Sequence, residues 1–149
     1  NRVVIPRAVI YADLDHFDEV LSNMIENAIK YTPKGSVSVK VISDNDRVRI
    51  KVSDTGIGIP AEDVPHLFQK FYRVDNGETR EIGGTGLGLY LIKTLTTSMG
   101  GTAGVESDYG SGSTFWIEFD CLSSDEIVQK AQEIKRRRER QDALRRQRS

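Results

Sequence analysis

The sequence has little of what would indicate a disulfide-bonded, metal-clustered or membrane-spanning protein. Only one of its 149 residues is cysteine, Cys121, which excludes an internal disulfide and a metal site built from cysteines alone. The longest apolar stretches, such as residues 86–92, are far shorter than the roughly 20 residues that cross a bilayer. No basic segment followed by an apolar one opens the sequence, so we expect no export signal and a cytoplasmic location.

The charge is almost balanced overall, but it is unevenly distributed along the chain. Residues 1–122 hold 12 Lys and Arg against 17 Asp and Glu, a net charge of −5, whereas residues 123–149 hold 9 against 5, a net charge of +4. So abrupt a change indicates a boundary near Ser123. We expect one domain over residues 1–122 and a basic helical tail over 123–149. Because the body is acidic, we expect no nucleic-acid partner.

Hydrophobic periodicity predicts three helices and about five strands in the body. The helices are expected from Asp13 or Asp15 to about Tyr31, over 61–68 and over 87–99. The extended segments are expected over 1–12, 36–42, 47–53, 102–107 and 113–120. Strands clustered in hairpins favour an α+β fold, a two-layer α/β sandwich with a mixed, roughly five-stranded sheet and three helices on one face.

Three Gly-rich segments, residues 54–58, 83–88 and 110–112, are candidates for binding a ligand through the backbone. The P-loop pattern is absent, and residues 83–88 lack both the preceding strand and the glycine spacing of a dinucleotide-binding loop. A helix is nevertheless expected directly after Gly84-Thr-Gly-Leu-Gly88. The free backbone amides of that helix would bind an anion such as a di- or triphosphate.

Four polar residues share one edge of the first expected helix: Asn23, Asn27, Lys30 and Tyr31. Two asparagines one turn apart are costly in a helix flanked by aliphatic residues unless their amides are satisfied. A carboxamide oxygen can bind Mg²⁺, which brings phosphate groups with it, and a lysine can neutralise phosphate charge. Taken alone, the same edge would also fit an ordinary polar helix surface.

Five segments together resemble the nucleotide-binding motifs of sensor histidine kinases. Residues 23–33 resemble the N box of that family, 54–60 the G1 box, 67–73 the F box and 84–89 the G2 box, and 110–115 is similar to the segment that closes the site. They follow the family's order and spacing over about residues 8–120. The resemblance implies the ATP-binding catalytic domain of a bacterial sensor histidine kinase, with a Bergerat (GHKL) fold.

The resemblance implies a role for each matching residue around ATP. Asp54 would accept a hydrogen bond from the adenine amine, Gly56, Gly58 and Ile59 would lie close to the base, and Thr114 would hold a water or the base beside Asp54. Asn27 would bind Mg²⁺. Asn23, Lys30 and Arg73 would act on the phosphates, Phe68 and Phe71 would anchor a mobile lid, and the remaining nucleotide-binding residues would be Tyr31, Gly84, Thr85, Gly86, Leu87 and Gly88.

The same resemblance favours transfer of the γ-phosphoryl group to a partner over hydrolysis of ATP. Related ATPases of the gyrase, mismatch-repair and chaperone types place a glutamate base four residues before the Mg-binding asparagine, and here that position is Asn23. We therefore expect transfer to a partner, although Glu19 or Glu26 could assist hydrolysis. The acceptor histidine lies elsewhere, since neither His16 nor His66 is in the family's acceptor pattern.

The partners implied are a dimerisation and histidine-phosphotransfer segment and a response regulator, with any membrane contact made through the parent protein. Two alternatives stay open: a GHKL-type ATPase or serine kinase, and a nucleotide-binding module without transfer activity.

Overall fold

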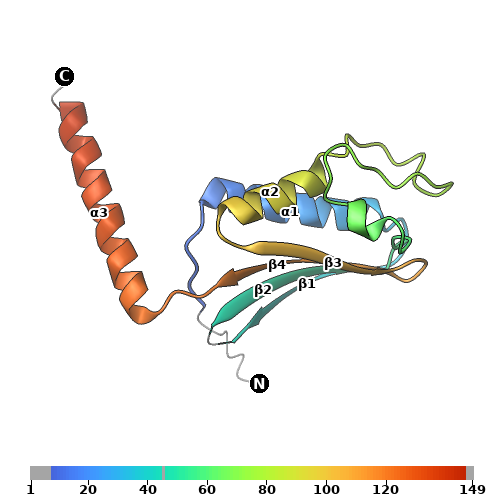
Figure 1. The fold of residues 1–149 in the computed structure, drawn as a ribbon, viewed down its shortest axis with the longest axis horizontal. Helices are drawn as coiled ribbons and strands as arrows, with labels where there is room; N and C mark the ends of the chain where they lie inside the picture. Colours follow the sequence, from blue (N-terminus) through green and yellow to red (C-terminus); the bar gives the residue numbers. More distant parts are fainter. Residues whose placement is uncertain (1–7, 45, 147–149) are drawn as a thin grey trace.

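The fold is a four-stranded antiparallel sheet with helices on one face. The computed structural model describes residues 8–44 and 46–146 (Figure 1). The strands lie in the order β1-β2-β4-β3, and every neighbouring pair is antiparallel. Their bounds are β1 Val37–Ser43, β2 Arg47–Asp54, β3 Thr102–Asp108 and β4 Gly112–Asp120.

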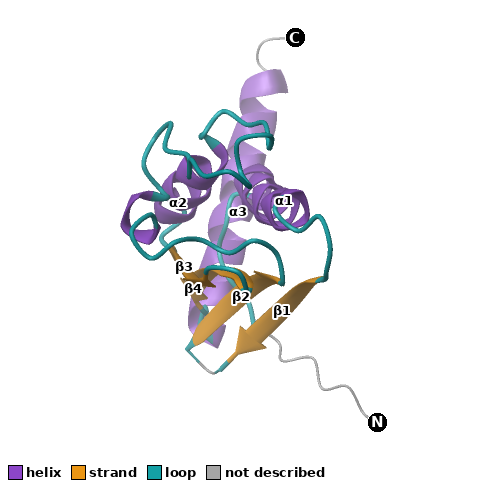
Figure 2. Cartoon of the chain, turned by 90° about the vertical axis from the view of Figure 1, so that its right-hand side faces the viewer, coloured by secondary structure: helices purple, strands orange, loops and turns teal. Residues whose placement is uncertain are grey.

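Two α-helices, α1 (Leu14–Lys30) and α2 (Gly88–Ser98), cover the same face of the sheet (Figure 2). The first begins at Asp13, whose side chain accepts a hydrogen bond from the backbone amide of His16 over 3.0 Å. This contact caps the free amides of the first turn and lowers the pKa of Asp13. A short 3-10 helix, η1 (Val64–His66), lies in the long connection between β2 and α2.

The core forms where the helix layer meets the two central strands. Alternate residues of β2 and β4 are buried, and they face Val20, Met24 and Ala28 of α1 and Ile92 of α2. Strict alternation in a strand places every second side chain on the covered face. The site residues at the ends of β2 and β4 are therefore held by the same packing that forms the core.

The predicted α+β two-layer sandwich is confirmed, but the sheet has four antiparallel strands rather than a mixed set of five. Of the extended segment expected over residues 1–12, residues 1–7 lie outside the described part, and residues 8–12 form no strand. Val9 meets the sheet through one hydrogen bond, from the Leu122 amide, beyond the end of β4. The helix expected over residues 61–68 shortens to η1.

The tail forms a separate helix, α3 (Ser124–Arg146), that projects away from the sheet (Figure 1). Ser123 and Glu126 exchange hydrogen bonds, Ser123 N to Glu126 Oε2 over 2.7 Å and Glu126 N to Ser123 Oγ over 3.3 Å. This reciprocal cap begins the helix directly after the sheet and lowers the pKa of Glu126. None of residues 124–146 is buried. Among the described residues, no helix is both long and apolar enough to cross a membrane.

Candidate functional site

A cavity of about 350 Å³ lies between α1, the start of α2, the ends of β2 and β4, and the long loop before α2. Twelve of the residues singled out in the sequence line it: Asn23, Asn27, Lys30, Tyr31, Asp54, Gly58, Ile59, Arg73, Gly84, Thr85, Gly86 and Gly88. Segments separated by more than 60 residues in the sequence thus meet at one concave site.

One end of the cavity is built around the carboxylate of Asp54, the last residue of β2. The residue is 9% exposed, and its Oδ1 accepts hydrogen bonds from the backbone amides of Gly56 over 2.9 Å and Ser113 over 3.3 Å. Two amides fix the orientation of the group through one oxygen. Among the described residues no hydrogen bond to Oδ2 is found, so this oxygen is available to a ligand in the cavity.

The residue beside Asp54 is Ser113, and the expectation that Thr114 occupies this place is wrong. Ser113 is directly opposite Asp54 in the β2–β4 register and lines the cavity. Thr114 pairs with Ser53, and their hydroxyls are 2.9 Å apart on the other face of the sheet. Successive residues of a strand point to opposite faces, so a shift of one residue removes Thr114 from the site.

The Gly-rich loop after Asp54 is held by close backbone approaches. Gly58 has φ +72°, and a Cβ there would lie 2.2 Å from the carbonyl oxygen of Asp108. Gly56 does not line the cavity; it packs against the carbonyl of Tyr31, which a Cβ would approach to 2.1 Å. The Gly56 contact therefore joins the loop to the end of α1, and the Gly58 contact joins it to the β3–β4 turn.

The other end of the cavity is polar and lies where α1 faces the N-terminus of α2. Asn23 Oδ1 and Asn27 Nδ2 lie 3.5 and 3.6 Å from the position that a Cβ of Gly88 would occupy. Asn23 Nδ2 donates to the carbonyl of Glu19 over 3.0 Å, which directs its oxygen towards α2. Lys30 Nζ lies against Gly84. Free helix amides, two carboxamides and an ammonium group together favour an anion.

A loop from about residue 74 to 87 covers this polar end. Arg73 lines the cavity, and its guanidinium donates to the carbonyl of Ile82 over 2.6 Å. Thr79 is buried at 6% exposure, and its hydroxyl donates to the carbonyl of Val74 over 2.7 Å. The hydroxyl of Tyr109 in the β3–β4 turn donates to Glu78 Oε2 over 3.0 Å, which raises the Tyr109 pKa. The Arg73 and Thr79 bonds therefore hold the loop's own shape, and the Tyr109 bond ties it to the β3–β4 turn.

The two phenylalanines expected to anchor this loop behave differently, and neither lines the cavity. Phe68 packs against the core, with its ring centroid 6.4 Å from that of Phe115 in an edge-on arrangement. Phe71 is 64% exposed, so the expectation that its ring anchors the loop is wrong. Its backbone has that role instead, because the Phe71 amide donates to the Gly86 carbonyl over 3.0 Å. Leu87, also expected at the nucleotide, does not line the cavity.

Eight further residues line the cavity, and of these only Glu26 had a role predicted from the sequence, as a residue that could assist hydrolysis: Glu26, Leu67, Tyr72, Val74, Thr79, Leu89, Ser113 and Phe115. Strand alternation could have found Ser113, because Phe115 two residues later is a clear core residue. Helical spacing places Glu26 beside Lys30, four residues later on the same edge of α1. Nothing in the sequence indicates Thr79, because the loop around it has no periodicity.

A metal ion would have few protein ligands here. In the described part of the chain, no group of three or more His, Cys, Asp or Glu side chains could hold one. Asn27 lines the cavity, and no hydrogen bond to its carboxamide is found among the described residues, so its oxygen is free to coordinate. Such a site fits Mg²⁺, which keeps several waters and is shared with substrate phosphates, better than a metal needing a full protein shell.

The family is decided by a match to one domain model. Residues 12–122 match the model of the histidine kinase-, DNA gyrase B- and HSP90-like ATPases. The chain belongs to this family. The match spans α1, the whole sheet and the cavity, and it ends just before α3.

Within this ATPase family, the relatives found are sensor histidine kinases. The circadian input-output histidine kinase CikA of Synechococcus elongatus is 46% identical over 117 residues, covering 76% of this chain and 16% of that protein. The sensor histidine kinase WalK of Bacillus subtilis is 44% identical over 105 residues, covering 68% of this chain and 17% of that protein. The chain therefore spans about a sixth of the length of these relatives.

Solved structures of histidine kinases share the fold. Full-length ShkA in complex with AMPPNP aligns with a TM-score of 0.68 at 32% identity, over 79% of this chain and 24% of that one. The catalytic domain of the histidine kinase ThkA, in a nucleotide-free form, aligns with a TM-score of 0.64 at 27% identity, over 76% of this chain and 73% of that one. The similarity to ThkA extends over most of an isolated catalytic domain.

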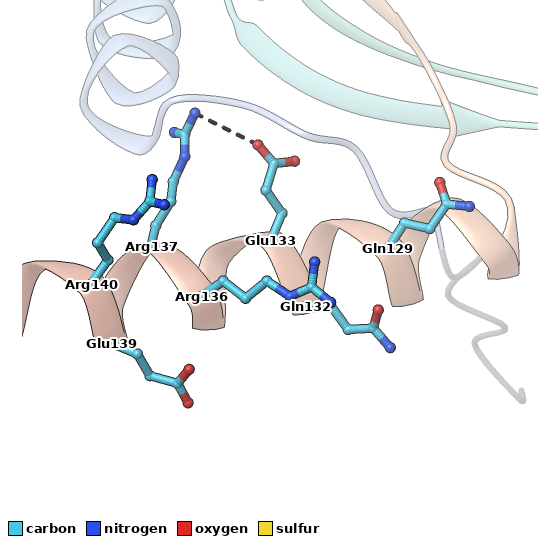
Figure 3. A pocket seen from close by; sticks show the side chains of 7 residues that line it. All are labelled: Gln129, Gln132, Glu133, Arg136, Arg137, Glu139 and Arg140. Atoms are coloured by element: carbon cyan, nitrogen blue, oxygen red, sulfur yellow. Dashed lines mark ion pairs between the residues drawn. The ribbon is translucent and has the colours of Figure 1, made fainter.

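A second hollow, outside the ATPase match, follows α3 (Figure 3). Its lining residues are Gln129, Gln132, Glu133, Arg136, Arg137, Glu139 and Arg140, all from the one helix. The side chains form local ion pairs such as Arg137 to Glu133 over 3.6 Å. A surface lined by a single solvated helix encloses no ligand, so the cavity at Asp54 is the candidate functional site.

Proposed function

We propose that this chain binds Mg·ATP and donates the γ-phosphoryl group to a histidine on a separate dimerisation and phosphoacceptor segment, as the catalytic domain of a sensor histidine kinase. The observation that carries the proposal is the polarity of the cavity. A buried carboxylate oxygen faces one end, while carboxamides, an ammonium group and helix amides face the other. This is the order of groups that a nucleotide with an amino-substituted base and a triphosphate would need.

At the base end, Asp54 would accept a hydrogen bond from the adenine amine through Oδ2, since backbone amides occupy Oδ1. Gly58 and Ile59 would lie along the base, and Tyr31 would close the side of the cavity next to α1. The partly buried carboxylate is held before the ligand arrives, so binding orders few further groups.

At the phosphate end, Asn27 would hold Mg²⁺, which when bound would neutralise phosphate charge. Asn23 and Lys30 would fix the phosphate oxygens, and the backbone of residues 84–88 would contribute amides. Arg73 would leave the Ile82 carbonyl and stabilise charge on the transferring group. The acceptor imidazole nitrogen would form the new P–N bond as the bond to the ADP oxygen breaks.

Hydrolysis is the second candidate, and one observation favours it. Glu26 lines the cavity one residue before Asn27, so a carboxylate is present near the phosphates. Asn23, which occupies the position of the glutamate base in the related ATPases, cannot act as a base. Glu26→Gln would abolish phosphate release if Glu26 activated water. It would leave transfer to a histidine unchanged if the kinase proposal holds.

The proposal includes a division of the chain and a cellular setting. Residues 1–122 would form the nucleotide-binding domain and residues 123–149 a separate basic tail. The partners would be the phosphoacceptor segment of a parent kinase and a response regulator, without nucleic acid and with membrane contact only through the parent protein. The domain would work in the cytoplasm, where ATP and response regulators are found.

Calorimetry with ATP and Mg²⁺ tests the binding step. Asp54→Asn should retain the fold, because an amide oxygen can still accept from Gly56 and Ser113, yet it should weaken ATP binding at least about tenfold. Asp120→Asn, an exposed change at the far end of β4, is the matched control and should bind like the wild type. Undiminished binding by Asp54→Asn would refute the assignment of the base end.

A further inference from the structure

Ser107 of β3 is a hydrogen-bond centre behind the base end of the cavity. It lies directly opposite Ser113 in the β3–β4 register, with the two hydroxyl oxygens 2.9 Å apart. The amide of Ile59, in the loop after Asp54, donates to Ser107 Oγ over 2.9 Å. The Ser107 hydroxyl donates to the carbonyl of Gly112 over 3.0 Å. One side chain therefore contacts the Gly-rich loop, the β3–β4 hairpin and the cavity-lining Ser113.

The direction of the bond between the two serines follows from counting protons. A hydroxyl has one proton to donate and two lone pairs that accept. The Ser107 proton is directed to the Gly112 carbonyl, which cannot donate, and one lone pair receives the Ile59 N–H. The remaining lone pair faces Ser113, so Ser113 must be the donor in the pair of serines. Its proton is then turned away from the cavity.

As a result, Ser113 can only accept hydrogen bonds from a ligand. It is 7% exposed, it lines the cavity, and it is directly opposite Asp54 in the β2–β4 register. The carboxylate of Asp54 also only accepts. The base end therefore presents two neighbouring acceptors. A purine with an amine at C6 donates to such a pair, whereas a purine with an oxygen at C6 places a third acceptor against it.

We propose that Ser107 is a positioning residue that sets base specificity: by holding the Ser113 hydroxyl as an acceptor, it makes the site select a 6-amino purine over a 6-oxo purine. The proposal rests on the proposed function, because it needs the base to lie at Asp54. Ser107 itself does not line the cavity and acts through Ser113.

The test is the ratio of the dissociation constants of inosine triphosphate and ATP, measured by calorimetry with Mg²⁺. The wild type should prefer ATP. In Ser107→Ala the Ser113 hydroxyl loses its acceptor and can turn to donate to the 6-oxo group, so the preference for ATP should fall by about three- to tenfold. A role of Ser107 in loop packing alone would weaken both nucleotides equally and leave the ratio unchanged.

Further variants keep the test decisive. Ser111→Ala, an exposed change in the same hairpin, should keep the wild-type ratio. Ser113→Ala should by itself lower the ratio of the two dissociation constants. Adding Ser107→Ala to Ser113→Ala should change that ratio no further. If Ser107→Ala fails to fold, Ser113→Ala takes its place in the test. An unchanged ratio in Ser107→Ala, or in Ser113→Ala, would overturn the inference. Failure of the wild type to bind ATP at all would instead refute the proposed function.

Discussion

Asn23 and Asn27, one helical turn apart on α1, both lie against Gly88, the first residue of α2. Their nearest carboxamide atoms are 3.5 and 3.6 Å from the place that a Cβ of this glycine would take. A Cβ at these distances would make only ordinary van der Waals contact, so the packing of α1 against the start of α2 itself brings the two carboxamides to face the free amides of α2. The polar end of the cavity is therefore a product of helix packing, and it forms only when the core is folded.

The Asn27 carboxamide should account for the dependence of ATP binding on Mg²⁺. In Asn27→Ala, calorimetry should show ATP binding that no longer improves when Mg²⁺ is added, because the protein oxygen that would coordinate the ion is gone. The free energy of unfolding should change by less than about 1 kcal/mol, since no hydrogen bond of that group within the described residues is lost. Ser22→Ala, an exposed change on α1, is the control. A full Mg²⁺-dependent gain in Asn27→Ala would exclude this role.

Two glycines of the covering loop should respond differently to alanine. Gly86 has φ +73°, and a Cβ there would lie 2.8 to 3.0 Å from backbone atoms of Phe71. Gly86→Ala should therefore break the Phe71–Gly86 hydrogen bond and weaken ATP binding at least about tenfold. A Cβ at Gly83 meets no heavy atom within 4 Å, so Gly83→Ala should bind ATP like the wild type. Equal affinities for the two variants would show that the loop closure does not shape the site.

The contact between the loop and the β3–β4 turn should depend on pH. The hydrogen bond to Glu78 raises the pKa of Tyr109 above its usual value of about 10. The protonated, neutral Tyr109 hydroxyl is the form that donates to Glu78. The contact is therefore fully present below the usual tyrosine pKa, and it is lost as the pH rises through the raised pKa of Tyr109.

Near-ultraviolet titration of the tyrosines should show the Tyr109 step at lower pH in Glu78→Gln than in the wild type. The pKa of Tyr72 is also raised, by its hydrogen bond to Asp63, so two tyrosines titrate late. The step that disappears in Tyr109→Phe belongs to Tyr109. A Tyr109 step at the same pH in the wild type and in Glu78→Gln would mean that the loop is not held at this point.

Removal of α3 should leave the body stable. None of residues 124–146 is buried, and α3 contacts the body through a partly exposed side chain, Lys130, whose Nζ lies 4.6 Å from the centroid of the Tyr11 ring. Deleting residues 124–149 should therefore shift the Tm by less than about 2 °C and leave the ATP affinity unchanged. A large fall in Tm would show that the tail belongs to the folded domain, against the division proposed at Ser123.

The sequence predicted most of the fold because its strongest periodicities are local. The apolar stripe of α1 and the alternation of β2 and β4 predict the elements that form the core. The prediction of a fifth strand was wrong because Val9 meets the sheet through a single hydrogen bond beyond β4, which no local pattern reveals. The exposure of Phe71 also depends on tertiary packing, since its backbone rather than its ring closes the loop.

At the site, the motifs predicted most of the residues that line the cavity from α1 and from the Gly-rich loops. They failed on β4, where the strand register decides which of two neighbouring residues faces the cavity. Thr114 and Ser113 are neighbours of similar chemistry, yet only Ser113 faces the cavity. Ser107 could not be predicted at all, because its importance comes from a cross-strand contact with Ser113 and a distant loop amide. Long-range polar contacts of this kind leave no periodic signal.

The most direct test of phosphoryl transfer uses ATP labelled at the γ-phosphate, Mg²⁺, this chain and a separate helical-hairpin fragment that carries a sensor-kinase acceptor histidine. We predict that label appears on the fragment in an acid-labile, alkali-stable form, that it requires the acceptor histidine, and that Asp54→Asn reduces it. Steady release of inorganic phosphate with no label on the fragment would contradict the kinase account and support an ATPase.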